Sequence, residues 1–229
     1  MQSVTKQKDV KMTAKKTAEP PAPATWQDDY VKIIGMIGDE RKQGVVDLEK
    51  YIWERTAWGT APASSMLKFH NAFDGGLIDH SINVTKTLFR LRAVLAPEIP
   101  VESCAIVGLY HDLGKTGAPD HPMYIPEVRK WQHETLGQMY KINDDFTFLD
   151  VPTRSLLYLL RFVNLTDEEA QAIRYHDGQY CDENKPVRNK ECKLTRLLHM
   201  ADSWSAGVIE KAAGVIEKQA PVPVSGINQ

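Results

Sequence analysis

An imidazole and a carboxylate stand side by side at His111 and Asp112, directly after an apolar run. The run from Cys104 to Tyr110 reads Cys-Ala-Ile-Val-Gly-Leu-Tyr and has no polar face, which predicts a buried helix. Burying a carboxylate without compensation is costly, by several kcal/mol. We therefore expect a cation beside Asp112, either a metal ion or a basic side chain.

A second histidine, His80, lies on the apolar stripe of another predicted helix. The paired glycines Gly75 and Gly76 mark a turn or a close approach, after which Leu77 and Val84 flank His80 at helical spacing. A histidine alone on such a stripe is more often a core residue than a ligand. His80 is not alone, because other helices carry candidates of the same kind.

Two more histidines follow on predicted helices in the second half of the chain. A helix predicted over residues 127–140 carries His133. A capping box that begins at Thr166 opens another helix, which ends at His176 with Gly178 as its stop. Both histidines are candidate metal ligands.

The last predicted helix, over residues 192–218, carries a carboxylate on its buried stripe. Asp202 follows Leu194 and Leu198 at a spacing of four residues. Imidazoles and carboxylates together suit a divalent manganese, iron, nickel, cobalt or zinc ion, whereas these residue types exclude a calcium cage or a thiolate site. Burying so many polar groups separately is unfavourable, so we expect one shared metal centre.

Composition limits the possible classes of protein. The chain has 229 residues, a formal net charge of −2 and three cysteines. This charge gives no footprint for nonspecific binding to anionic membranes or nucleic acid, so nucleic acid is expected only as a substrate. The sequence shows neither an apolar run of about 18 residues nor the core of a signal peptide, and the cysteines lack metal-type spacing. We expect a cytoplasmic protein, and its oligomeric state stays open.

Four segments are expected along the chain. Residues 1–24 hold five lysines and three prolines and are predicted to be a disordered tail. Residues 25–58 are predicted to form two N-terminal covering helices, residues 59–218 the main domain and residues 219–229 a flexible tail. The predicted fold is all-α, a compact helical bundle around a site for one or two metal ions.

The order of the candidate residues resembles the HD-domain metal-dependent phosphohydrolase superfamily. Its signature of a histidine, a His-Asp pair and a distal aspartate matches His80, His111-Asp112 and Asp202. The similarity spans about residues 60–210 and includes features of small bacterial and phage members. The segment Gly75 to His80 is also similar to the HD portion of certain 3′-to-5′ exoribonucleases, without a counterpart of their separate nucleic-acid-binding domain.

The resemblance implies which residues would hold metal. His80, His111, Asp112 and Asp202 would hold one divalent ion. In members with two metals, Asp112 would bridge to a second ion held by His133 and His176. In some single-metal relatives, a histidine in the region of His133 serves acid–base chemistry or phosphate contact instead.

The implied reaction is hydrolysis of a phosphate ester or anhydride, most plausibly of a small nucleotide, by metal-activated water. Asp112, Lys115 and His133 are the candidate catalytic residues. Lys115 could meet phosphate charge at the end of its helix, or it could simply favour the helix dipole. Lys68 and His70, just before the glycine pair, are candidate substrate-binding residues together with Lys115, although a loop lysine is often only solvated.

Other classes of protein could use a similar set of residues. An exonuclease or a cyclic-nucleotide phosphodiesterase would use the same metals on a diester, and a basic groove would favour the nuclease. Some proteins of the same fold use a di-iron site for oxygen chemistry. A non-catalytic binding module would be favoured by the loss of a ligand, whereas all the ligands are present here.

Overall fold

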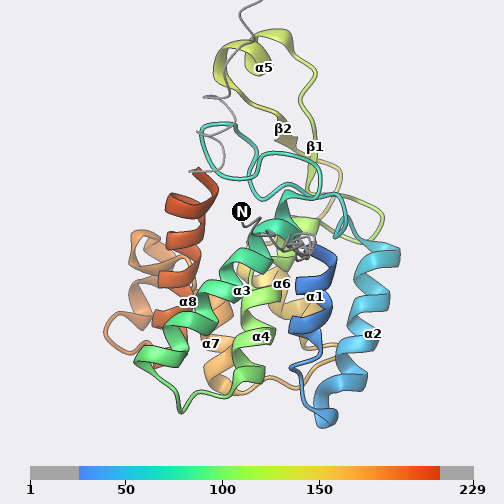
Figure 1. The fold of residues 1–229 in the computed structure, drawn as a ribbon. Coiled ribbons are helices and arrows are strands. Elements are labelled where there is room, and N and C mark those ends of the chain that lie inside the picture. The colour runs from blue at the N-terminus through green and yellow to red at the C-terminus, as the bar shows by residue number, and fades with distance from the viewer. Residues whose placement is uncertain (1–25, 212–229) are drawn as a thin grey trace, which may run out of the picture.

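The computed structural model describes residues 26–211, so the predicted tails, 1–24 and 219–229, lie outside it. The described chain is mostly helical, which confirms the predicted all-α class, and it holds one small two-stranded sheet. Its helices form a bundle with an arm projecting from one end (Figure 1). The α-helices are α1 (Trp26–Ile34), α2 (Asp39–Arg55), α3 (Gly76–Leu95), α4 (Val101–Tyr110), α5 (Lys130–Leu136), α6 (Val151–Leu159), α7 (Asp167–Tyr175) and α8 (Lys193–Trp204).

Shorter elements join these helices. The 3₁₀ helices are η1 (Leu113–Thr116), η2 (Gly178–Tyr180) and η3 (Asp182–Val187), and η4 (Ser205–Ile209) is a π-helix that continues α8. The strands β1 (Tyr124–Pro126) and β2 (Tyr140–Ile142) pair antiparallel, with Tyr124 opposite Ile142. In the described range, no helix is both long and apolar enough to span a bilayer.

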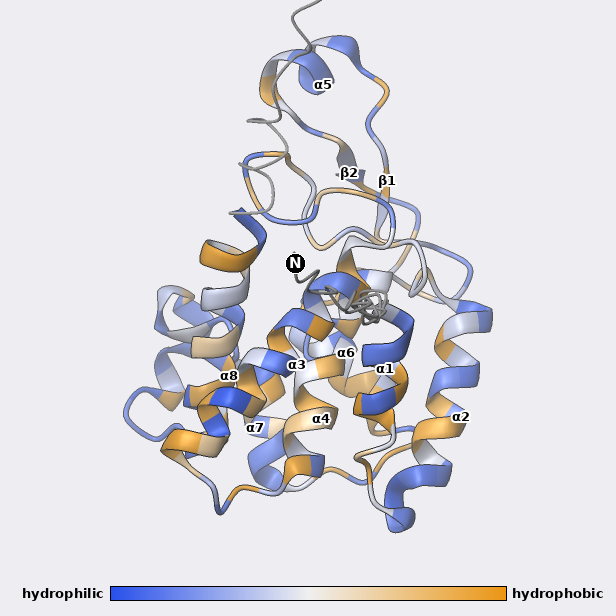
Figure 2. Ribbon diagram, in the orientation of Figure 1, coloured by the Kyte–Doolittle hydropathy of each residue, from blue (hydrophilic) through white to orange (hydrophobic). Residues whose placement is uncertain are grey.

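Helix α4 runs through the middle of the core, as its apolar sequence predicts. Every residue from Ser103 to Tyr110 is buried, and α4 appears mostly white to orange in Figure 2, whereas α5 in the arm is mostly blue. Gly108 lets α3 come close, because a Cβ at this position would lie 2.9 Å from the Cα of Thr85. The two helices therefore bring their functional ends together.

Helices α1 and α2 cover the bundle and are joined to it by a largely buried carboxylate. Glu49 on α2 accepts hydrogen bonds from the hydroxyls of Tyr30, at 2.7 and 2.8 Å, and of Tyr110. The indole of Trp53 donates a third, at 2.9 Å, and that of Trp58 donates to the Tyr30 hydroxyl at 3.1 Å. We call these five residues the Glu49 cluster.

A second polar connection joins α2 to the other side of the bundle. Arg41 lies 2.8 Å from Glu102 at the start of α4 and 2.7 Å from the buried Glu169 on α7. Glu169 also completes the capping box that the sequence predicts at Thr166, since each residue's side chain bonds the other's backbone N–H. One guanidinium thus compensates a carboxylate that would otherwise be buried without a counter-charge.

The arm departs from the prediction. The helix expected over residues 127–140 is shorter than predicted: α5 covers only Lys130–Leu136, and short segments on either side connect it to β1 and β2. The loop before α3 joins this arm, because Leu67 N–H donates to Gly137 O at 2.8 Å and Met139 N–H to Ser65 O at 2.9 Å. The arm therefore has its own backbone pairing and does not pack along the bundle.

Candidate metal centre

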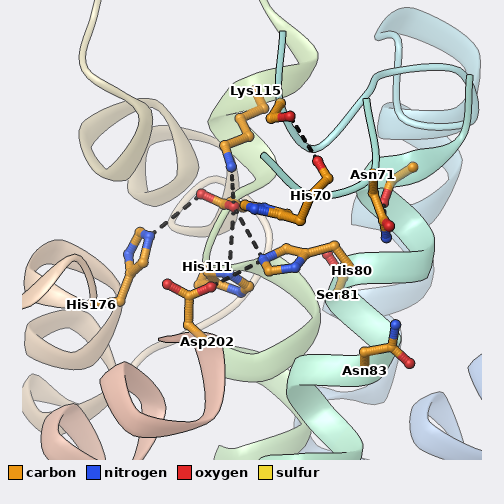
Figure 3. Close-up of polar contacts among 12 residues, drawn as sticks. His70, Asn71, His80, Ser81, Asn83, His111, Lys115, His176 and Asp202 are labelled. Atoms are coloured by element: carbon orange, nitrogen blue, oxygen red, sulfur yellow. Dashed lines mark hydrogen bonds and ion pairs between the residues drawn. The ribbon is translucent and has the colours of Figure 1, made fainter. Parts of the chain in front are cut away.

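Four helix ends or helix faces bring five of the predicted ligands together. His80 lies in the first turns of α3, His111 and Asp112 directly follow α4, His176 directly follows α7, and Asp202 lies on α8. Figure 3 shows His80, His111, His176 and Asp202 pointing toward one another from these elements, and the carboxylate of Asp112 is within 4 Å of each of the three histidines. All but Asp202 are almost completely buried.

The carboxylate of Asp112 is the centre of the cluster. Its Oδ2 lies 3.7 Å from Nε2 of His80 and 3.5 Å from Nε2 of His111, and its Oδ1 lies 3.4 Å from Nε2 of His176. Asp202 Oδ1 approaches Nε2 of His80 at 3.1 Å. Each histidine therefore directs the same ring nitrogen toward the carboxylates.

The other ring nitrogens show which tautomer two of these histidines adopt. Nδ1 of His111 lies 2.9 Å from the carbonyl of Gly108, and Nδ1 of His176 lies 2.9 Å from the carbonyl of Ile173. A carbonyl only accepts, so Nδ1 carries a proton, and in the neutral form of either ring the lone pair is at Nε2. Nε2 of His111 is buried with no hydrogen-bond partner in the described chain. A lone pair facing a carboxylate needs a cation between them.

The cluster also shifts the pKa values of its members. Burial opposes the carboxylate of Asp112, but the ammonium of Lys115 and the neighbouring imidazoles prevail and hold its pKa well below the usual range. Burial likewise opposes charge on the histidines. It lowers the pKa of His111 to about 4, whereas the carboxylates of Asp202 and Glu210 overcome it and raise the pKa of His80 to about 10. The site thus favours positive charge next to its carboxylates.

Lys115 supplies part of this positive charge. It lies on η1, and its Nζ is 2.6 Å from Oδ2 of Asp112 with the side chain mostly buried. Burial opposes its ammonium, yet Asp112 raises the pKa of Lys115 above its ordinary value. Lys115 therefore points into the cluster and does not only cap the helix.

Three sets of donor atoms in the described chain lie close enough together to share an ion. The sets are His80, His111 and Asp112; His111, His176 and Asp202; and His70, His80 and Glu210. Within each set the ligand atoms lie within 4.8 Å of one another. The imidazole and carboxylate donors, with the unpaired Nε2 of His111, fit a divalent transition metal.

The structure does not bring His133 to this cluster. His133 lies on α5 in the projecting arm, where its side chain is exposed, and it belongs to none of the donor sets found in residues 26–211. The second metal site with His133, and its catalytic role, were implied by the resemblance; His133 does lie on a helix, but the arm holds that helix away from the cluster. Among residues 26–211, the histidine that faces the second oxygen of Asp112 is His176.

The two other predicted substrate residues occupy different positions. The ring of His70 lies 4.6 Å from that of His80, and its Nε2 is buried without a partner in the described residues. Ser64 holds this loop by donating to the carbonyl of His70 at 2.7 Å. Lys68 is exposed, with its ammonium 5.0 Å from the ring centre of Phe69. Only His70 therefore reaches the cluster.

Two contacts around the cluster were not predicted. Glu210 lies 3.0 Å from Nδ1 of His80, although the sequence offered no reason to single it out. His199 donates from its Nδ1 to the carbonyl of His176 at 2.8 Å. Gly178 makes room for it, since a Cβ there would lie 2.3 Å from the His199 ring.

Comparisons with known proteins agree with this geometry. The family model of the HD domain matches residues 77–207, which is more than half of the chain. No curated protein and no solved structure gives a match. The matched range holds His80, His111, Asp112, His176 and Asp202. The chain therefore belongs to the HD-domain superfamily of metal-dependent phosphohydrolases.

Proposed function

We propose that this protein hydrolyses a phosphate ester or anhydride of a small nucleotide at the Asp112 cluster. One observation carries the proposal: buried imidazole lone pairs converge on a carboxylate that is also paired with a mostly buried lysine. This combination offers ligands for a cation together with a positive charge for a phosphate.

The proposed ligands of the principal ion are His80, His111, Asp112 and Asp202. A bound divalent ion would lower the pKa of a coordinated water and polarise a phosphoryl oxygen. The protein would fix the ligand directions beforehand, because His111 and His176 are held by backbone carbonyls. A second ion would use Asp112 Oδ1 and His176, with the remaining positions left to water or substrate.

Lys115 and His70 are the proposed contacts to the phosphate. Lys115 would keep its charge in the site and offer N–H donors to the oxygens that gain charge in the transition state. His70 lies between Lys115 and His80 in Figure 3 and has an Nε2 without a partner in the described residues, which could hydrogen bond to the substrate. These two side chains flank the carboxylate from different segments, so they could position one phosphoryl group between them.

The loop that carries His70 is an argument for a nucleotide as the substrate. It exposes Phe69, a ring that suits stacking on a base, and Lys68, a cation next to that ring. A cation and a flat ring beside a phosphate site are the features expected for a phosphorylated nucleoside. Lys68 would then contact the substrate outside the metal cluster.

A diester in an oligonucleotide is the second candidate, and the arm supports it. Trp131 is 60% exposed, and it follows Arg129 and Lys130 directly in the chain. Aromatic and basic side chains together are typical of surfaces that bind single strands. This exposed set favours an exonuclease if the strand reaches both the arm and the cluster.

One assay separates these candidates. The full chain, supplied in turn with Mn²⁺, Ni²⁺, Co²⁺ or Fe²⁺, is incubated with nucleoside mono- and triphosphates, cyclic dinucleotides and short single-stranded RNA and DNA. Phosphate, pyrophosphate or triphosphate released from mononucleotides is the expected result. Shortened oligonucleotides with untouched mononucleotides would favour the exonuclease. A fully metal-loaded protein that cuts nothing in the panel would overturn the proposed function.

The assay has a matched pair of variants. Asp112→Asn alters the central carboxylate, whereas Asp144→Asn makes the same change at an exposed loop position. Activity that survives Asp112→Asn at the level of Asp144→Asn would come from a contaminant or from another site.

A further inference from the structure

Glu210 makes a buried contact with a proposed metal ligand from outside the matched family range. Its carboxylate oxygens lie 3.0 and 3.2 Å from Nδ1 of His80, and only 7% of Glu210 is exposed. The two residues are 130 positions apart in the chain, and Glu210 follows the end of the family match at residue 207. The contact therefore lies just beyond the matched range, on the helical continuation of α8.

A π-turn explains how Glu210 reaches the site. A regular α-helix advances about 100° per residue, so a residue eight positions after Asp202 would point about 80° away from it. The N–H of Glu210 instead bonds the carbonyl of Ser205, five residues back, because η4 holds one extra residue in its turn. The extra residue takes up about 100° and returns Glu210 to within about 20° of the face of Asp202. A regular helix would place Ile209 there.

The π-turn is also fixed against α3. Ser205 is buried, and its hydroxyl lies 3.3 Å from that of Thr87 on α3. Asn83, also on α3, donates to Oε1 of Glu210 at 3.4 Å. These contacts hold the carboxylate in place from the same helix that carries His80.

His80, like His111 and His176, has a hydrogen-bond partner at Nδ1, but its partner is a charged group. His111 and His176 each donate their Nδ1 proton to a backbone carbonyl, whereas the acceptor at His80 is a carboxylate. When the imidazole of His80 binds a metal ion in place of its second proton, the remaining Nδ1 proton points at Glu210 and Nε2 faces Asp202 and Asp112. A carboxylate acceptor also makes the imidazole a stronger donor to a metal than a carbonyl does.

We propose that Glu210 is a positioning residue of the metal centre, which holds His80 in its metal-binding tautomer and strengthens it as a ligand. This inference rests on the metal centre of the proposed function. One juxtaposition carries it. The π-turn places the buried carboxylate of Glu210 beside Nδ1 of His80, while Nε2 of the same ring faces the other ligands.

The test measures metal affinity and does not depend on turnover. Mn²⁺ is titrated calorimetrically into the full-length metal-free wild type and into Glu210→Ala, Glu210→Gln and the exposed control Glu40→Gln. We expect Glu210→Ala to bind Mn²⁺ about 10- to 100-fold more weakly, as is typical when such a partner is lost. Glu210→Gln should lie between, because its amide oxygen can still accept the Nδ1 proton but carries no charge. Glu40→Gln should match the wild type.

A double variant shows whether Glu210 acts through His80. In a His80→Ala background, Glu210→Ala should change the Mn²⁺ affinity by less than about twofold, because the residue it positions is gone. Histidine NMR gives a readout that a merely structural role would not move: the slowly exchanging Nδ1 proton of His80 should disappear in Glu210→Ala, while that of His111 remains.

The outcomes separate this inference from the proposed function. A wild-type chain that binds no Mn²⁺ would overturn the metal centre, and the inference with it. Wild-type Mn²⁺ affinity in a folded Glu210→Ala would overturn the inference alone. If the alanine variant does not fold, wild-type Mn²⁺ affinity in Glu210→Gln would overturn it. Circular dichroism melting curves report whether each variant is folded.

Discussion

Asp112 directly follows His111 in the chain, and Glu49 accepts a hydrogen bond from the neighbouring Tyr110. These two carboxylates are largely buried but are compensated in opposite ways. Asp112 faces the ammonium of Lys115 and the rings of three histidines, whereas Glu49 accepts from neutral hydroxyls and an indole. The pKa of Asp112 is held well below its usual range, while burial raises that of Glu49 despite hydrogen bonds from Tyr110 and Tyr30. Burial alone therefore does not mark a functional carboxylate, and the kind of partner does.

The largest effect is expected from replacing Asp112, the carboxylate that faces charged and metal-ligating groups. Asp112→Asn should reduce metal affinity by more than the roughly 100-fold typical of losing an outer partner, and activity with it. It should also lower the free energy of unfolding by as much as about 3 kcal/mol, since Lys115 loses its counter-ion. Metal content by mass spectrometry and urea unfolding measure the two losses.

A double variant separates the two effects of Asp112. Asp112→Asn combined with Lys115→Met should regain most of the stability, because no unpaired charge remains. The double variant should still not bind metal. Metal binding restored in the double variant would show that Asp112 serves mainly as the partner of Lys115.

The neutral member should behave differently. Glu49→Ala should lower the free energy of unfolding by about 2–4 kcal/mol, because the hydroxyls of Tyr30 and Tyr110 lose their acceptor in the core. Urea unfolding measures this, and Mn²⁺ affinity should stay within about twofold of the wild type. A loss of metal affinity like that of Asp112→Asn would show that the Glu49 cluster belongs to the metal centre.

The smallest expected effect is the pH dependence of stability, which has opposite signs for the two carboxylates. A carboxyl whose pKa is raised on folding binds its proton more readily in the folded chain, so its contribution to stability falls as the pH rises above its ordinary value of 4.5. Unfolding free energies of the wild type relative to Glu49→Gln should therefore decrease from pH 4 to pH 7. Asp112 has the opposite sign, because its lowered pKa makes its contribution fade as the pH drops below 3.8. A difference independent of pH would contradict the assignment for Glu49.

The sequence was sufficient for the parts of the site that follow from helical periodicity. His80, His111 and Asp202 fall on or after apolar stripes, and the capping box at Thr166 and the stop at Gly178 fix where His176 lies. These signals are local, so they can be read without knowledge of the fold. The all-α class follows from the same periodicity.

The features that depend on distant contacts could not be predicted. Val128, Trp131 and Leu136 have a helix-like spacing, but the backbone pairing of β1 with β2 leaves their side chains exposed and removes His133 from the site. Helix α6 is a different case: its signal is local, since Asp150 caps it by accepting from Thr153 N–H at 2.7 Å, and it was nevertheless not predicted. Long-range pairing leaves no periodic trace in the sequence.

Glu210 and Glu49 were missed for related reasons. Regular α-helical spacing from Asp202 points to Ile209, so only a π-turn makes Glu210 a candidate. Glu49 looks like a solvated residue on an amphipathic helix, and its partners Tyr30 and Tyr110 lie 19 and 61 positions away. Neither carboxylate stands in a motif that would distinguish it from a surface glutamate.

The contact between Tyr110 and Glu49 has a consequence for what counts as an autonomous folding unit. The family match starts at residue 77, yet Tyr110, which lies inside it, donates its hydroxyl proton to Glu49, which lies outside it. The ring of the fully buried Trp58 also packs against that of Tyr110, with the ring centres 6.2 Å apart. A fragment cut at residue 77 would expose this aromatic face and leave a polar group of the core without its acceptor. Recombinant fragments and chimaeras of this protein should therefore begin before α1, so that Tyr110 keeps its contacts with Glu49 and Trp58.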